Sequence, residues 1–456
     1  MKIALVHPFF LPGLGYEATG WFHAFRGLGH AVRVFTSPYA PQSLRCVYEQ
    51  NLSEGVELFD GGEVHRLHAW LGPRRIVTCP GLTEALRGFR PDLTIIHEPA
   101  SLFPTRLIKE WATVGGGLMC MTEQNHAQRR TTLPRPLEML RNLLLEAGFF
   151  VLKRSAVRRC MEASDAVLFV TPDTYDFVLP RVASGGRREL LLRKCFLVPY
   201  GFDSAAFLVD EEGRSAERRR LGIADDEVVA LHSCRMTPVK RLDIWVSVVS
   251  RAMRRVPRLK AMLIGLRKGD AESDRILSLI TRSDLKERFI YLPFANRETL
   301  ARLYNAADFG IWHLQPSITI QEAMGTGLYM VLVNDATISH LVLEPQTGRY
   351  FEPGNYAQLE ERIVNAAGFL IGERIVSKLE ARRCRAAINA HRFSYRSLAE
   401  RIVAAAQDPA NAEMHLRTQE VGETLPPGSM RAFAAGEVLP SQVGTPDGGK
   451  CDYASA

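Results

Sequence analysis

The chain has 456 residues, enough for two or three domains of ordinary size. Its composition, with 46% hydrophobic and 23% charged residues, excludes a wholly disordered, collagen-like or fibrous protein. A net charge of +7 is too small to indicate a nucleic-acid-binding protein. The eight cysteines form no CxxC pair, so we expect neither a zinc site nor a disulfide framework, and a cytoplasmic protein fits best. No signal sequence and no apolar run of ~18 residues is found, so we expect neither export nor a membrane span.

The first half of the chain alternates predicted strands and helices. Short apolar runs predict buried strands at residues 3–7, 32–36, 93–97 and 118–122, and an amphipathic stretch predicts a helix over residues 17–29. Strands that alternate with helices are typical of a parallel sheet covered on both faces. We therefore expect a Rossmann-like domain over residues 1–199.

The same pattern restarts near Tyr200. The predicted strands and helices of this second part are residues 228–233, 242–255, 260–264, 275–281, 289–292, 297–307, 309–313, 318–326 and 329–333. The sequence thus predicts an α/β protein with two doubly wound parallel-sheet domains facing across a cleft, the second over residues 200–373. We expect helices over residues 374–407 and a largely disordered tail over residues 408–456.

Loops that follow the strands are the candidate sites, because ligands of such sheets bind beyond the carboxyl ends of the strands. Gly13 and Gly15 lie in one such loop, where glycine lets the backbone approach an anion closely. A flexible turn explains the same two glycines equally well.

A second loop, over residues 235–241, carries Arg235, Lys240 and Arg241. It lies directly after a predicted strand and before a predicted helix. Cations at a helix start oppose the helix dipole unless an anion is bound, so this loop is predicted to clamp a diphosphate.

A third loop leads into the helix predicted at residues 318–326. Pro316 and Ser317 mark the helix start, so the free N–H groups near Ser317, Ile318 and Thr319 could receive a phosphate. Glu322 lies about one turn further along the helix, within reach of a sugar hydroxyl. Its apolar neighbours make a plain surface carboxylate the weaker interpretation.

Two histidines, His97 and His126, lie near the ends of predicted strands. Each could be a base, a group that binds an acceptor hydroxyl, or a hydrogen-bonded structural histidine.

Taken together, these motifs resemble the GT-B glycosyltransferases, in particular family 4, whose members are retaining and use nucleotide sugars. The resemblance extends from Met1 to about Gln407. It is carried by VPYGFD at residues 198–203, the loop at 235–241, FIYLPFANRETLARLYNAAD at 289–308, EAMGTG at 322–327 and FSY at 393–395.

The resemblance implies roles for the donor side. Arg235 and Lys240 would hold the donor diphosphate, Phe294 would lie in the nucleobase loop, and Glu322 would bind the ribose. Leu314 stands where the family has the first Glu of its E-x7-E signature, which lies near the donor sugar. This departure leaves the donor sugar open.

On the acceptor side, the resemblance implies that His126, with His97 as the alternative, orients the acceptor, with Glu123 beside it. The implied reaction moves a sugar from a UDP- or GDP-sugar to an acceptor hydroxyl with retention, without a metal and without a resident cofactor. A catalytically silent nucleotide-sugar-binding regulator and a nucleotide-sugar epimerase remain alternatives.

One segment on the acceptor side is strongly basic. Residues 129–159 carry eight Arg or Lys against two acidic residues, beside several leucines and phenylalanines. A basic amphipathic segment favours docking on an anionic membrane, as for a lipid-linked sugar acceptor. A solvated helix face over a core explains the pattern equally well.

Overall fold

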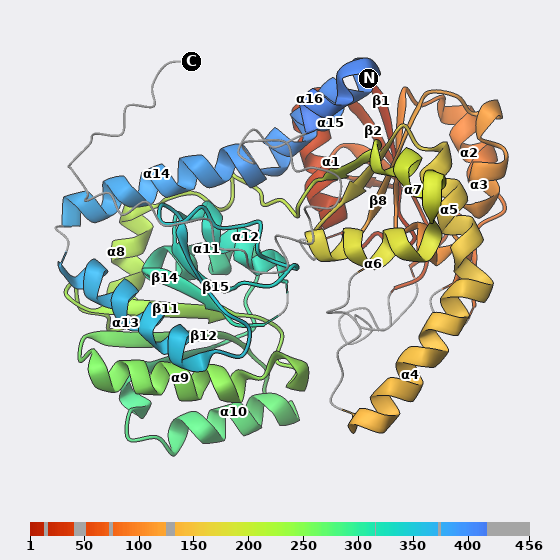
Figure 1. Cartoon of the computed structure of the whole chain (residues 1–456). Coiled ribbons are helices and arrows are strands. Elements are labelled where there is room, and N and C mark those ends of the chain that lie inside the picture. The colour runs from red at the N-terminus through yellow and green to blue at the C-terminus, as the bar shows by residue number, and fades with distance from the viewer. Residues whose placement is uncertain are drawn as a thin grey trace.

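The computed structural model describes residues 1–12, 17–40, 52–72, 76–124, 133–314, 316–372 and 375–416. Within them the chain forms two separate parallel sheets, one in each half of the chain, with helices packed on both (Figure 1). The α/β, doubly wound fold class expected from the sequence is confirmed.

The first sheet has eight strands in the order β10-β9-β8-β7-β1-β2-β4-β3. All neighbours are parallel except the hairpin of β3 and β4. Most strands are continuous buried apolar runs, as sheets covered on both faces require. The strands are β1 (Lys2–Val6), β2 (Ala31–Thr36), β3 (Gly55–Phe59), β4 (Gly62–Arg66), β7 (Leu93–His97), β8 (Gly117–Thr122), β9 (Ala166–Phe169) and β10 (Cys195–Leu197), beside a small hairpin of β5 (Trp70–Leu71) and β6 (Val77–Thr78).

Helices cover both faces of this sheet, and each face has its own core of buried side chains. One helix, α4, projects away from both sheets (Figure 1). The helices are α1 (Glu17–Gly27), α2 (Leu82–Phe89), α3 (Thr105–Lys109), α4 (Arg135–Gly148), the π-helix η6 (Phe149–Lys153), α5 (Arg154–Ala163), α6 (Pro172–Val182) and α7 (Gly185–Leu192).

The second sheet has six parallel strands in the order β13-β12-β11-β14-β15-β16 and one large core. The strands are β11 (Val228–Ser233), β12 (Leu259–Leu266), β13 (Phe289–Pro293), β14 (Phe309–Trp312), β15 (Tyr329–Val333) and β16 (Gly348–Phe351). The helices are α8 (Glu211–Arg220), α9 (Leu242–Arg255), α10 (Ala271–Thr281), α11 (Arg297–Ala306), α12 (Ile318–Gly325) and α13 (Tyr356–Gly372).

Two long C-terminal helices connect the halves. Helix α14 (Ile375–Phe393) lies along the second half, where the buried Arg382 guanidinium donates to the carbonyl oxygens of Thr326 and Ala307 at 2.7 and 2.8 Å. Helix α15 (Tyr395–Gln407) returns to the first half, and its Tyr395 ring packs edge-on against Trp21 with centroids 5.2 Å apart. The two C-terminal helices therefore run from the second half back to the first.

The tail expected from residue 408 begins with ordered structure. A 3-10 turn, η9 (Pro409–Asn411), leads into α16 (Ala412–Leu416), and Leu416 is only 2% exposed in the core of the first half. The boundary at residue 408 is thus too early, because one buried leucine on a five-residue helix leaves no periodicity to detect. Residues 417–456 lie outside the described residues.

Candidate active site

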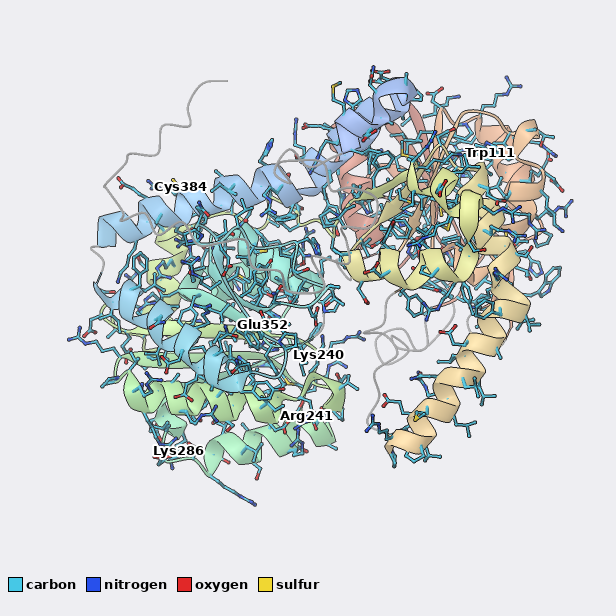
Figure 2. The ribbon with its side chains drawn as sticks, in the orientation of Figure 1. Trp111, Lys240, Arg241, Lys286, Glu352 and Cys384 are labelled. Carbon is cyan, nitrogen blue, oxygen red and sulfur yellow. The ribbon has the colours of Figure 1, made fainter. Side chains whose placement is uncertain are left out.

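Two cations lie close together on the loop that follows β11. Arg235 is exposed, and Lys240 ends the short 3-10 helix η7 (Pro238–Lys240). Burial lowers the pKa of Lys240, and the positive charge of Arg235 lowers it further. Figure 2 shows Lys240 on the side of the second half that faces the first half. Two like charges held this close favour an anion between them.

Arg241, the third cation of this loop, is engaged elsewhere. Its guanidinium donates to Asp243 at 3.0 Å and holds the pKa of that carboxyl below its usual range. Its carbonyl oxygen lies 3.1 Å from Nε2 of His313, so the backbone here is fixed as well. Arg241 therefore orders the loop that carries Arg235 and Lys240.

The start of α12 faces the same loop. The Thr319 hydroxyl donates to the carbonyl oxygen of Ser233 at the end of β11, at 3.0 Å, and also lies 2.8 Å from the Ser317 hydroxyl. Ser317 makes no side-chain cap, and among the described residues the N–H groups of Ile318 and Thr319 have no acceptor. Open N–H groups at a helix start, fixed beside two cations, suit a phosphate group.

Glu322 is buried in the next turn of α12. Burial raises the pKa of Glu322 to about 8, and the neighbouring Arg297 guanidinium opposes this rise. No residue that the structure describes forms a hydrogen bond with this carboxyl. It can therefore still accept from, or donate to, a ligand hydroxyl.

Two other residues complete the donor side. Phe294, just after β13, is exposed, and the Arg267 guanidinium lies 5.0 Å from the centroid of its ring. An exposed aromatic ring with a cation over it is a surface on which a base can stack. Leu314, just past β14, is half-buried and provides no carboxylate at this position.

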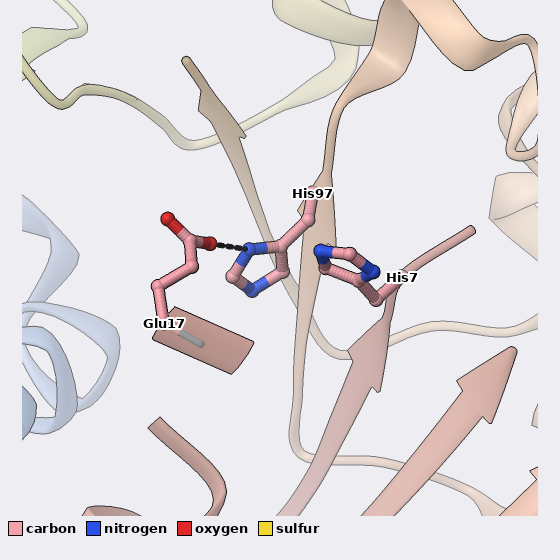
Figure 3. Close-up of side chains that lie close together, drawn as sticks. All are labelled: His7, Glu17 and His97. Atoms are coloured by element: carbon pink, nitrogen blue, oxygen red, sulfur yellow. Dashed lines mark hydrogen bonds and ion pairs between the residues drawn. The ribbon is translucent and has the colours of Figure 1, made fainter. Parts of the chain in front are cut away.

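The carboxyl edge of the first sheet carries a different set of groups. His97, the last residue of β7, is buried, and its Nδ1 lies 2.8 Å from Oε1 of Glu17, the first residue of α1 (Figure 3). Burial lowers the pKa of His97 to about 3 and raises that of Glu17 to about 7. The His7 ring lies beside His97, with centroids 5.2 Å apart. At neutral pH the histidine pair is therefore uncharged.

Glu123 extends this network toward the connection between the halves. The Tyr200 hydroxyl donates to Glu123 Oε2 at 3.0 Å, and the Glu123 carboxyl is hydrogen-bonded to that of Glu17. Burial and the charge of Glu17 raise the pKa of Glu123 well above its usual value. The Glu123 backbone N–H donates to Glu98 Oε1 at 2.9 Å. The raised pKa values of the two neighbouring carboxyls favour their protonated forms.

His7, Glu17 and His97 are also residue types that bind metals, and one potential ligand atom of each lies within 4.8 Å of the others. Three of their atoms already have partners, however. Nδ1 of His7 accepts from the backbone N–H of Phe9 at 3.1 Å, and His97 bonds to Glu17. We therefore interpret the cluster as a hydrogen-bonded network.

The two edges come within electrostatic reach of each other around Tyr395. Burial is the largest cause that raises the pKa of Tyr395. The charges of Glu17 on the first edge and Glu322 on the second raise this pKa further. Nearby, Arg297 of α11 pairs with Asp203 at 3.0 Å, and both charges act on His23 of α1. The structure therefore brings Glu123, His97 and Glu322 toward one region.

Gly13, Gly15 and His126 lie outside the described residues, as do residues 129–132 of the basic segment. Sequence reasoning missed Glu17, Tyr200 and Arg297. The only available signal was position: Glu17 opens a helix after a glycine loop, and Arg297 opens another after the nucleobase loop.

Two family models match this chain. The model described as "Glycosyl transferase 4-like domain" matches residues 13–191, and the model "Glycosyl transferases group 1" matches residues 213–366. The chain belongs to the group 1 glycosyltransferases. The first match covers Glu17, His97 and Glu123 of this glycosyltransferase. The second covers the loop at 235–241 and helix α12 with Glu322.

Curated relatives are similar over part of their length. The chain is 34% identical over 134 residues to a D-inositol 3-phosphate glycosyltransferase of Kineococcus radiotolerans, covering 27% of this chain and 31% of that protein. It is 27% identical over 214 residues to the protein of the same name from Nocardia farcinica, covering 45% of each. The chain thus matches less than half the length of these relatives.

Solved structures share the fold over nearly the whole chain. The Anabaena protein HepE in complex with UDP-glucose has a TM-score of 0.58 at 18% identity, with 89% of this chain and 99% of that chain covered. Sucrose-phosphate synthase of Thermosynechococcus elongatus has a TM-score of 0.59 at 16% identity, with 90% and 99% covered. These similarities establish the GT-B fold of this glycosyltransferase.

A search of the described part of the chain for a helix both long and apolar enough to cross a membrane finds none.

Proposed function

We propose that this glycosyltransferase moves a sugar from a nucleoside-diphosphate sugar to an acceptor hydroxyl. The observation that carries the proposal is the pair Arg235 and Lys240 beside the open first turn of α12. Negative charge builds up on the diphosphate as the bond to the sugar breaks. Cations and N–H groups fixed in advance at that position stabilise the transition state more than the bound substrate.

The rest of the donor would extend over the second half of the chain. Phe294 would stack on the base, and the buried Glu322 would hold the ribose hydroxyls. A UDP- or GDP-sugar fits this arrangement, and the UDP-glucose bound by the HepE structure supports a uridine donor. Because side chains and backbone N–H groups meet the diphosphate charge, the scheme uses no metal. Retention of configuration belongs to the proposal through the resemblance to family 4.

The acceptor would bind at the carboxyl edge of the first sheet. Glu123 and His97 lie there with Glu17, and we assign His126 to the same side. The acceptor proposed is a sugar or a lipid-linked sugar at the cytoplasmic membrane face, as in cell-envelope polysaccharide or glycolipid synthesis. In this scheme residues 1–199 form the acceptor-side domain and residues 200–373 the donor-side domain.

The test is incubation of the purified protein with a panel of UDP- and GDP-sugars, with and without sugar acceptors, followed by mass spectrometry. The proposal requires release of nucleoside diphosphate and formation of a glycoside. Tight donor binding without turnover would show a silent regulator instead, and an isomerised donor would show an epimerase.

A further inference from the structure

The projecting helix α4 and the π-helix η6 expose apolar side chains that soluble surfaces rarely carry together. We call Leu137, Leu140, Leu143, Leu144, Phe150 and Val151 the apolar ridge. Each is exposed, Leu143 by 66% and Val151 by 81%. Of all the residues of α4, Gly148 is the only buried one. Six exposed apolar side chains on one continuous stretch of helix mark a contact surface.

The polar side of α4 faces the protein. Leu137, Leu140 and Leu144 are three and four residues apart, so they share one side of the helix. Glu146 falls on the opposite side, at about 100° of rotation per residue. Its carboxyl accepts from the Arg181 guanidinium of α6 at 2.6 Å. The helix is thus anchored through a polar contact and turns its apolar side outward, the reverse of an ordinary surface helix.

The charges around the apolar ridge decide what covers it. Arg135 is exposed at the start of α4, and Arg154 lies 5.3 Å from the centroid of the Phe150 ring. Arg141 and Lys153 also lie on α4 and η6, which together carry two acidic residues, Glu138 and Glu146. A second copy of the chain would bring these cations against each other. An anionic lipid surface supplies both the apolar interior and the opposite charge.

We propose that the apolar ridge inserts into the headgroup region of an anionic bilayer. This inference deepens the proposed function, since it rests on the lipid-linked acceptor named there and identifies the surface that would reach it. Insertion depends on the leucines, phenylalanine and valine of the ridge, with the cations adding attraction. Arg154 and Arg158 are half-buried, so α5 itself contributes less than its sequence suggests.

The test uses the full chain and two matched substitutions. Leu143→Glu places a charge in the apolar ridge, and Leu190→Glu places one on α7, where the leucine is 65% exposed. Co-sedimentation is measured with phosphatidylglycerol-containing and with pure phosphatidylcholine vesicles, at ~0.15 M and ~0.5 M salt, where screening shortens to about 4 Å.

We expect the native chain to bind the anionic vesicles more strongly than the neutral ones and to keep part of that binding at high salt. Leu143→Glu should weaken binding about tenfold or more, because it removes an inserted leucine and adds a repelled carboxylate. Leu190→Glu should bind as the native chain does. Donor hydrolysis should be unchanged in both variants, so loss of vesicle binding and loss of catalysis are separate readouts.

Three results would overturn the proposal. In the first, the native chain stays in the supernatant equally with both vesicle types. In the second, Leu143→Glu and Leu190→Glu bind the anionic vesicles equally. In the third, the native chain is released completely from the anionic vesicles at high salt. Sedimentation analysis adds a fourth: a native dimer that Leu143→Glu converts to a monomer would make the apolar ridge an interface between two copies.

Discussion

The carboxyl edges of the two sheets carry different groups. The second sheet presents Arg235 and Lys240 beside an open helix start. The first presents Glu17, Glu98 and Glu123, with His97 held neutral by burial. One edge suits a diphosphate, and the other suits hydroxyl groups that need hydrogen-bond acceptors. Two sheets of the same topology class can therefore present different chemical groups, because the loops after their strands differ.

The cationic edge should be the more sensitive to mutation. We expect Lys240→Ala to reduce turnover by about 10²-fold or more, because losing one contact to a developing charge costs about 3 kcal/mol. Steady-state kinetics with the donor that the panel of UDP- and GDP-sugars selects measure the effect. The matched control is Arg254→Gln on α9, which removes an exposed cation bound to Asp284 and should keep near-native turnover. Equal losses in the two variants would contradict the assignment of the clamp.

The hydrophobic cores of the two halves can be compared through α16, because this helix contributes Leu416 to a core of the first half only. Leu416→Ala should lower the free energy of unfolding by about 2 kcal/mol, because a buried leucine leaves a cavity. Met414→Ala, two residues away and 68% exposed, should change it by less than about 0.5 kcal/mol. Chemical denaturation distinguishes them, and equal stabilities would mean that α16 does not belong to the core.

A third experiment compares one carboxyl from each edge. Glu322→Gln should weaken nucleoside diphosphate binding about tenfold, since it replaces the group proposed to hold the ribose. Glu17→Gln should leave that affinity unchanged, because Glu17 lies on the acceptor edge. Calorimetry with UDP and GDP gives both values. Weaker binding by Glu17→Gln alone would reverse the assignment of the two edges.

The smallest effect concerns pH. The folded-state pKa values of Glu17 and Glu322, about 7 and about 8, lie above the ordinary value of 4.5. Between pH 4.5 and those values the unfolded chain ionises while the folded chain stays protonated, so stability falls as pH rises. Glu322→Gln, which cannot ionise, should therefore become more stable relative to the native chain as pH rises from 5 to 8. A constant difference across that range would show that Glu322 is ionised in the fold.

Features of the fold could be predicted where their signal lies within a short stretch of the sequence. Arg235, Lys240, Ser317 and Glu322 lie on contiguous motifs at predicted strand ends, and the strand at 329–333 begins and ends where predicted. Strand β16 was not located, because GRYF is short and carries a charge.

Other features depend on residues far apart in the chain. Glu17 and His97 are 80 positions apart, and Glu123 and Tyr200 are 77 apart, so neither bond leaves a trace in a single sequence. The orientation of helix α4 could not be predicted from the sequence for another reason. Amphipathic periodicity gives the helix but not which side faces the protein, and that was decided by the contact of Glu146 with Arg181.

The two chain crossings between the halves are joined to each other. The Phe202 N–H donates to the Phe393 carbonyl oxygen at 3.0 Å, and the Tyr395 N–H donates to that of Phe202 at 2.9 Å. Gly20 and Gly201 leave room for the Tyr395 ring, which a β-carbon at either position would overlap. The two crossings thus form one hydrogen-bonded seam, and a further bond joins the halves where the Asp173 N–H donates to the Ala336 carbonyl oxygen at 2.9 Å. Any opening that admits a donor or releases a product must turn both crossings together.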